Sequence, residues 1–127
     1  MRTQKPIPTD QELEILKLVW QRGQATVREI YQDLLKQRKI AYTTVLTMMG
    51  ILERKGHLKK TAGERAYVYS PAQPQAQVVE GMVKEFVKRV FNGSPKPLLV
   101  HLVGDRELSP SELDEIENLV KNRRKKR

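Results

Sequence analysis

The sequence predicts a mainly α-helical protein in two parts, with one β-hairpin at the end of the first part. Three observations lead to this prediction. Capping boxes, in which Thr or Ser stands three residues before Glu, mark three helix starts. Apolar residues recur at helical spacing through most of the 127-residue chain. Residues 65–69 break that spacing with a β-rich run, which ends at Ser70-Pro71.

Three helices are predicted in the first part of the chain, over about 10–22, 27–38 and 42–55. Capping boxes that begin at Thr9 and Thr26 open the first two helices, and Gly23 and Gly56 end the first and the third. The apolar residues expected on the inner faces of the first two helices are Leu13, Leu16, Val19, Trp20, Ile30, Leu34 and Leu35.

A hairpin and a connector follow the third helix. The turn-rich stretch 61–64 precedes the β-rich run, and this predicts a β-hairpin with a basic tip. Residues 72–77 are rich in Pro, Gln and Ala, which is typical of a connector. The sequence therefore predicts a first domain over 1–73 and a second over 74–127.

The second domain is predicted to be helical throughout. Its helices are expected over 77–91, over 96–103, and from Pro110, which follows the capping residue Ser109. The tail 121–127 is basic and is expected to be frayed.

The third helix has two unlike faces when its residues are placed about 100° apart. The residues predicted to face the core are Val45, Met48, Met49 and Leu52. The opposite face holds Thr43, Thr47, Gly50 and Arg54, flanked by Thr44, Leu46 and Ile51. Three helices followed by a basic hairpin are the order of a winged helix-turn-helix, in which the third helix enters the major groove and the hairpin touches the DNA backbone.

Charge favours the same interpretation. The formal net charge is +9, and residues 1–73 carry 13 basic and 7 acidic side chains. A basic first domain is typical of a protein that binds a polyanion. Gly50 costs about 1 kcal/mol inside a helix, and close approach to a ligand is one compensation. The predicted DNA-binding residues are Thr43, Thr44, Thr47, Arg54, Lys55, Lys39, Lys60 and Arg65.

The second domain has more apolar surface than one small chain can cover. The helix over 77–91 repeats apolar pairs four residues apart, which gives it a broad apolar face. A homodimer with an isologous core would bury this face; packing back onto the first domain of the same chain is the alternative. The predicted dimer-interface residues are Val79, Met82, Val83, Phe86, Val90, Leu98, Leu99, Leu102, Leu113, Ile116 and Leu119.

Several classes of protein are excluded by the sequence. With no cysteine, the chain has no disulfide, thiolate metal site or cysteine nucleophile, and we expect a cytoplasmic protein. No catalytic motif is present, so we expect no enzyme, cofactor or bound metal. The longest nearly apolar run, 97–104, is too short for a membrane span, so a membrane-embedded chain is not expected. We expect His57 at the surface, or beside a phosphate.

The sequence resembles the penicillinase and methicillinase repressors and their copper-responsive relatives, the BlaI/MecI/CopY family. The most specific stretch runs from Ala41-Tyr42-Thr43-Thr44-Val45 to Arg54-Lys55-Gly56, and Arg65-Ala66-Tyr67-Val68-Tyr69-Ser70-Pro71 follows it. The resemblance implies a dimeric winged-helix repressor that binds a palindromic operator. It places Thr43, Thr44 and Thr47 in the groove, and Arg54, Lys55 and the hairpin on phosphates.

The resemblance also bears on how such a repressor is released. In antibiotic-responsive members a membrane-bound sensor metalloprotease triggers cleavage of an Asn-Phe bond, which aligns here with His101-Leu102, a pair of different residue types. Copper-responsive members carry a cysteine cluster that this chain lacks. Two other functions stay open: a winged helix that docks a protein through Leu46 and Ile51, and non-specific nucleic-acid binding through the tail.

Overall fold

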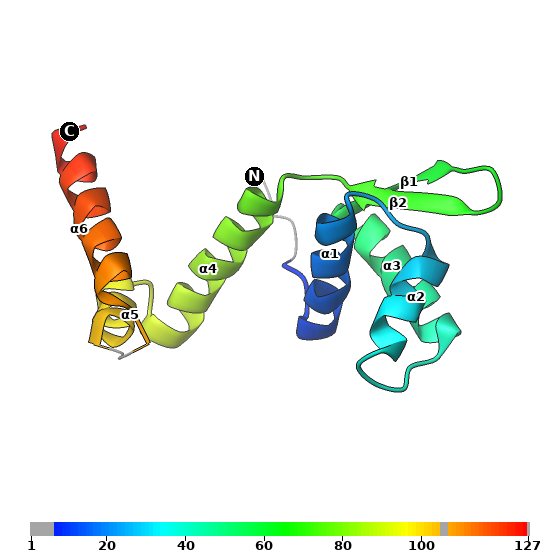
Figure 1. Cartoon of the computed structure of the whole chain (residues 1–127), viewed down its shortest axis with the longest axis horizontal. Coiled ribbons are helices and arrows are strands. Elements are labelled where there is room, and N and C mark those ends of the chain that lie inside the picture. Colours follow the sequence, from blue (N-terminus) through cyan, green and yellow to red (C-terminus); the bar gives the residue numbers. More distant parts are fainter. Residues whose placement is uncertain (1–6, 105–106, 127) are drawn as a thin grey trace. The chain divides into compact units, whose positions relative to one another are not determined.

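A computed structural model describes residues 7–104 and 107–126. Contacts within the chain form two compact units that divide between Val83 and Lys84. The elements, labelled in Figure 1, are α1 (Asp10–Arg22), α2 (Val27–Leu35), α3 (Tyr42–Arg54), β1 (Leu58–Ala62), β2 (Tyr67–Pro71), α4 (Gln75–Phe91), α5 (Pro95–Gly104) and α6 (Pro110–Lys125). The predicted mainly helical architecture, with its single hairpin, is confirmed in these residues.

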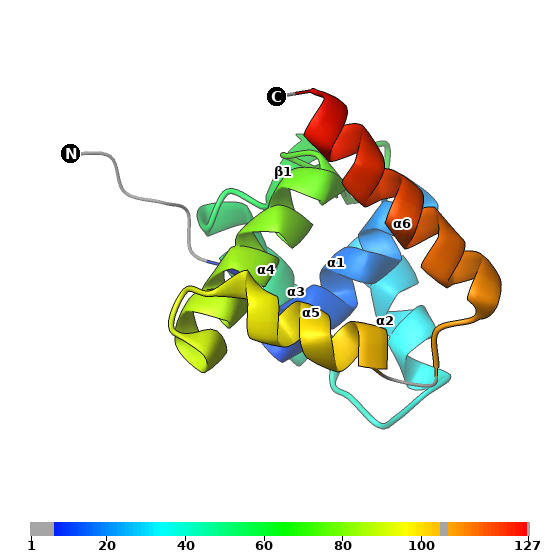
Figure 2. The same ribbon diagram turned by 90° about the vertical axis from the view of Figure 1, so that its left-hand side faces the viewer.

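The first unit is a three-helix core closed by a β-hairpin. Figures 1 and 2 show α1, α2 and α3 gathered together in both views. β1 and β2 pair antiparallel, with Leu58 opposite Pro71 and Ala62 opposite Tyr67. Ala25, between α1 and α2, exchanges two backbone hydrogen bonds with Tyr69 at 2.9 and 2.8 Å and so ties the hairpin to the helices. The largest fully buried side chains are Ile15, Leu16, Ile30, Leu34, Met49, Leu52, Leu58, Val19 and Val45.

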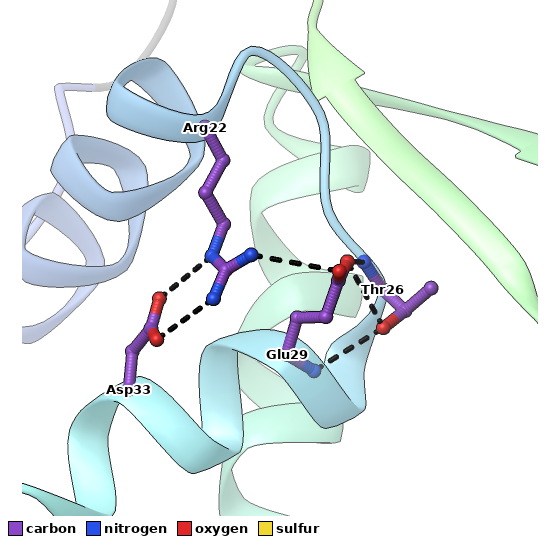
Figure 3. A network of polar contacts seen from close by, with 4 residues as sticks. All are labelled: Arg22, Thr26, Glu29 and Asp33. Carbon is purple, nitrogen blue, oxygen red and sulfur yellow. Dashed lines mark hydrogen bonds and ion pairs between the residues drawn. The ribbon is translucent and has the colours of Figure 1, made fainter.

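An ion-pair network holds the end of α1 against α2 (Figure 3). The Arg22 guanidinium donates two hydrogen bonds to the Asp33 carboxylate, at 2.8 and 2.9 Å, and one to Glu29 at 3.5 Å. The hydrogen bond from Arg22 lowers the pKa of Asp33. Glu29 also completes the capping box with Thr26, whose backbone N–H it accepts at 2.9 Å. One guanidinium therefore joins the helix start to the preceding helix.

The predicted helix ends are right for α1 and differ for α2. Gly23 ends α1 with a φ of +86°, as the sequence predicts. α2 ends at Leu35 instead of 38, because the backbone N–H groups of Lys36 and Gln37 bond to carbonyls three residues back, those of Asp33 and Leu34, and not four back as in an α-helix. The prediction that Leu35 faces the core is wrong: its side chain is 44% exposed.

The start of α4 belongs to the first unit. The helix begins at Gln75, two residues before its predicted start, since the carbonyl of Pro74 accepts the backbone N–H groups of Gln77 and Val78. Val78 is buried in the winged-helix core and Met82 packs against it half-buried. The predicted domain boundary at 73/74 remains a prediction.

The second unit contains little buried surface. Among its described residues, only Val87 is buried. α6 opens with the predicted Ser109 capping box, with Pro110 in its first turn. It continues to Lys125, so the prediction of a frayed tail is wrong for these residues; Arg127 lies outside the described residues. Lys and Arg are good helix formers, and their charge is favourable at a helix C-terminus.

No helix among the described residues combines the length and the apolar character that a membrane crossing requires.

Candidate nucleic-acid interface

α3 separates a buried face from an exposed one. The core predictions for this helix are confirmed: Val45, Met48, Met49 and Leu52 are all buried. Thr43, Thr44 and Thr47 are exposed on the other side. Threonine hydroxyls can bond base edges or phosphates, and the methyl can meet a thymine methyl. This face therefore presents short polar side chains on a helix whose position the core fixes.

Gly50 lies in the middle of the exposed face. A Cβ at this position would meet only the Nη1 atom of Arg54, at 3.8 Å, which is an ordinary contact. Packing within the described chain thus gives no reason for a glycine here, although glycine destabilises a helix interior. The missing side chain leaves room for another molecule to approach the backbone of α3.

Three of the predicted basic residues are exposed to solvent. Arg54 is exposed at the end of α3, Lys39 is exposed just before the helix, and Arg65 is exposed at the hairpin turn. Long basic side chains of this kind can keep their charged ends in solvent, where a phosphate could be reached. Their role in holding phosphates remains a prediction.

Lys55 is partly buried and is held in an ion pair instead. Its Nζ atom lies 2.7 Å from the buried Glu12 carboxylate, which also accepts the backbone N–H of Thr9 at 3.0 Å. Burial raises the pKa of Glu12, but the hydrogen bonds from Lys55 and Thr9 outweigh it, so the net pKa is lowered. Lys55 therefore fastens the end of α3 to the start of α1.

Lys60, on β1, also has partners within the chain, an acidic side chain and an aromatic ring. Its Nζ atom lies 3.7 Å from a carboxylate oxygen of Glu53 and 4.5 Å from the centre of the Tyr67 ring. The ion pair is partly exposed, so water screens it.

The hairpin turn itself needs Gly63, because a Cβ there would lie 2.5 Å from the carbonyl oxygen of Ala66.

The prediction that His57 lies at the surface or beside a phosphate is wrong. Its side chain is 4% exposed, and the Nε2 atom of Gln73 lies 3.1 Å from its Nδ1 atom. The carbonyl of His57 accepts the backbone N–H of Ala72 at 3.0 Å. Gly56, with a φ of +85°, turns the chain back at this point, so the next side chain points inward.

Tyr42 is an exposed residue of this surface that we did not predict. It is 41% exposed at the first position of α3, and its ring meets that of Tyr31 edge-on, with centroids 5.5 Å apart. A helical wheel places it beside Leu46, four residues on. This four-residue spacing from Leu46 is the feature of the sequence that could have predicted Tyr42 on the exposed surface of α3.

A three-helix core, an antiparallel hairpin bonded to the segment after α1, and an exposed third helix define a winged-helix protein. A family model described as "Penicillinase repressor" matches residues 8–122. The chain therefore belongs to the penicillinase repressor family, as the sequence resemblance indicates, and relatives in this family are named as repressors and transcriptional regulators.

Individual relatives agree with this assignment. The penicillinase repressor of Bacillus licheniformis is 29% identical over 126 residues, which cover 95% of this chain and 98% of that protein. The solution structure of monomeric B. licheniformis BlaI in complex with the blaP half-operator is 29% identical, with a TM-score of 0.51, and covers 57% of this chain and 89% of that one.

A more distant likeness reaches further along the chain. The crystal structure of a mutant of E. coli MarR complexed with operator DNA has a TM-score of 0.52 and covers 90% of this chain and 74% of that one. Its identity is 15%, so this likeness shows the fold alone.

Proposed function

We propose that this repressor acts on double-stranded operator DNA, with α3 in the major groove and the β1–β2 hairpin on the flanking backbone. The observation that carries the proposal is the exposed face of α3, where Thr43, Thr44 and Thr47 stand opposite the side that is buried in the core. The B. licheniformis relative, whose structure was solved on a half-operator, supports it.

The basic residues divide into two groups in this proposal. Arg54, Lys39 and Arg65 are exposed and are the proposed phosphate contacts. Lys55 and Lys60 remain predicted DNA-binding residues, but each lies in an ion pair, with Glu12 and Glu53 respectively. A charge already paired adds less to the attraction for phosphate, so their substitution should weaken binding less.

A mobility-shift titration at two salt concentrations tests the proposal. We expect the full chain to bind the promoter of its own operon, and to bind it more weakly at the higher salt because counterions are released from the neutralised phosphates. The variant Thr47→Glu should lose binding, because it places a carboxylate in the groove. Gln11→Glu, the same added charge on an exposed residue of α1, is the matched control.

Two results would contradict the proposal. One is the absence of binding to that promoter at low salt. The other is a Thr47→Glu variant that binds as well as Gln11→Glu. The second result, with a protein recovered alongside the chain after nuclease treatment, would favour a protein-docking module, for which exposed Leu46 is the relevant observation.

We also propose that two copies pair through their C-terminal helices. Of the predicted interface residues, most are exposed in the single chain: Val79, Val83, Phe86, Val90, Leu99, Leu102, Leu113 and Leu119. Leu98 and Ile116 are half-buried, and Met82 is half-buried against the winged-helix core. So much exposed apolar surface is typical of an interface.

Sedimentation equilibrium of the full chain tests the dimer. A mass of two chains at micromolar concentration is expected, and the two-fold symmetry then predicts half-sites about 10 base pairs apart, or a multiple of that. A monodisperse monomer at this concentration would contradict it.

Release by a membrane sensor metalloprotease remains a proposal. The predicted bond joins His101 and Leu102, which are exposed within α5, where a protease could hold them only after the helix opens. Mass spectrometry of the chain from induced cells should then find a fragment ending at His101. Recovery of intact chain from cells in which the promoter has been derepressed would argue against cleavage.

A further inference from the structure

α3 carries one large aliphatic side chain on the exposed side of its first half, where the other exposed large side chain is the aromatic Tyr42. Leu46 is 45% exposed and is not among the residues packed against the core. It lies three residues after Thr43, so the two side chains are neighbours on the surface of the helix. Its neighbour four residues on is Gly50, which has no side chain to cover it.

Ile51, the other apolar residue beside this face, is placed differently. It is half-buried and lies on the opposite flank of the threonine face. It is also about 7.5 Å further along the helix, from five residues at about 1.5 Å each. In helix-turn-helix proteins the N-terminal residues of the recognition helix contact the base edges. Leu46 is therefore the apolar side chain placed to meet bases.

We infer that Leu46 is a specificity-determining residue that reads the C5-methyl group of a thymine in each operator half-site. An alkyl side chain cannot bond the donors and acceptors of the major groove, and the thymine methyl is the apolar group that the groove offers. Contact would remove both apolar groups from water. The inference rests on the proposed binding of α3 to DNA and names the base chemistry that this helix selects.

Replacement of single thymines by deoxyuridine isolates this contact. Uracil keeps the pairing and the O4 acceptor of thymine and lacks only the methyl group. An operator would first be selected from random duplex DNA with the full-length chain. Each thymine of one half-site would then be replaced in turn, and binding would be measured for the wild type and for Leu46→Ala, an exposed substitution that spares the core.

We expect one thymine at which loss of the methyl weakens wild-type binding about fourfold, the effect of burying about one methyl or methylene group. Leu46→Ala should bind the thymine and uracil forms equally. The control variants Ile51→Ala and Thr47→Ser should keep the difference between the thymine and uracil forms. Thr47→Ser is included because Thr47 also carries a methyl group, the other candidate for a contact with the thymine methyl.

The possible outcomes distinguish a failure of the proposed role of Leu46 from a failure of the proposed operator binding. If selection enriches no sequence, the proposed operator binding fails. If a sequence is enriched but no uracil substitution weakens binding, or if the weakening persists in Leu46→Ala, operator binding stands and the role of Leu46 is overturned. Loss of the difference in Thr47→Ser alone would assign the methyl contact to Thr47 and likewise overturn it.

Discussion

The two units of this chain differ in where their apolar side chains go. In the first unit, Leu16, Ile30 and Met49 are fully buried, and the exposed side of α3 is mostly small and polar. In the second unit, Phe86 is 40% exposed and Leu119 is 67% exposed, although both belong to apolar helix faces. The first unit buries most of its large apolar side chains within the chain, and the second unit leaves most of its own exposed.

This difference shows how one short chain can hold two kinds of interface. Apolar burial is the main favourable term in folding, so a unit with a closed core can keep a polar face for a polar ligand. A unit that leaves apolar faces open gains stability when a second copy covers them. The predictions below test this contrast, beginning with the largest expected effect.

Truncation of an exposed aromatic should act on the second unit alone. We expect Phe86→Ala to destabilise the dimer by about 3–5 kcal/mol, the usual cost for an aromatic that is buried once two copies pair. Unfolding measured at several protein concentrations checks this, because the loss should shrink as dilution separates the two copies and removes the contact from the wild type as well. A loss that does not depend on concentration would mean that Phe86 packs only within its own chain.

The matching truncation in the first unit should behave in the opposite way. Leu16 is fully buried, so Leu16→Ala should cost about 2–5 kcal/mol. The loss in the midpoint of unfolding should be the same at every protein concentration, because this core lies within one unit. Lys17→Ala, the exposed neighbour on α1, is the control and should change stability little.

The buried carboxylate of Glu12 should make the first unit sensitive to acid. Its pKa is below the ordinary value of 4.5, so its stabilising effect is present above pH 4.5 and is lost as the pH falls through its native pKa. Glu12→Gln should cost roughly 1–3 kcal/mol at neutral pH, because Lys55 loses its charged partner. Denaturant unfolding from pH 7 to pH 3 should show a smaller decline in the variant than in the wild type.

Gly50 gives the smallest and most selective effect. Gly50→Ala should raise the free energy of unfolding by up to about 1 kcal/mol, because a Cβ fits without a clash and alanine favours the helix. The same variant should bind operator DNA less tightly, because the added methyl stands on the groove-facing side. A variant that is more stable and binds equally well would show that DNA does not approach α3 there.

Much of the first unit could be predicted from the sequence because its signals are local. The capping boxes at Thr9 and Thr26 and the stop at Gly23 lie where predicted. The sidedness of α3 followed from periodicity alone. The positions of Leu35 and His57 could not be predicted in this way, because each depends on where the chain turns after a helix ends.

The charged side chains near α3 also could not be fully placed from local sequence signals. A wheel places Thr43 and Thr47 on an exposed face, since the helix axis fixes their direction. It cannot show that Lys55 reaches Glu12, 43 residues earlier in the chain, at 2.7 Å. The role of a long side chain depends on a partner that folding brings near.

The amino-acid order by itself determined the succession of helices and hairpin and the outward side of α3, because hydrophobic spacing and capping act over a few residues. Only the tertiary structure decided which lysines are held in ion pairs, that the first turns of α4 join the winged-helix core, and that His57 is buried. Those outcomes depend on side chains distant in sequence that compete for the same space and the same charges.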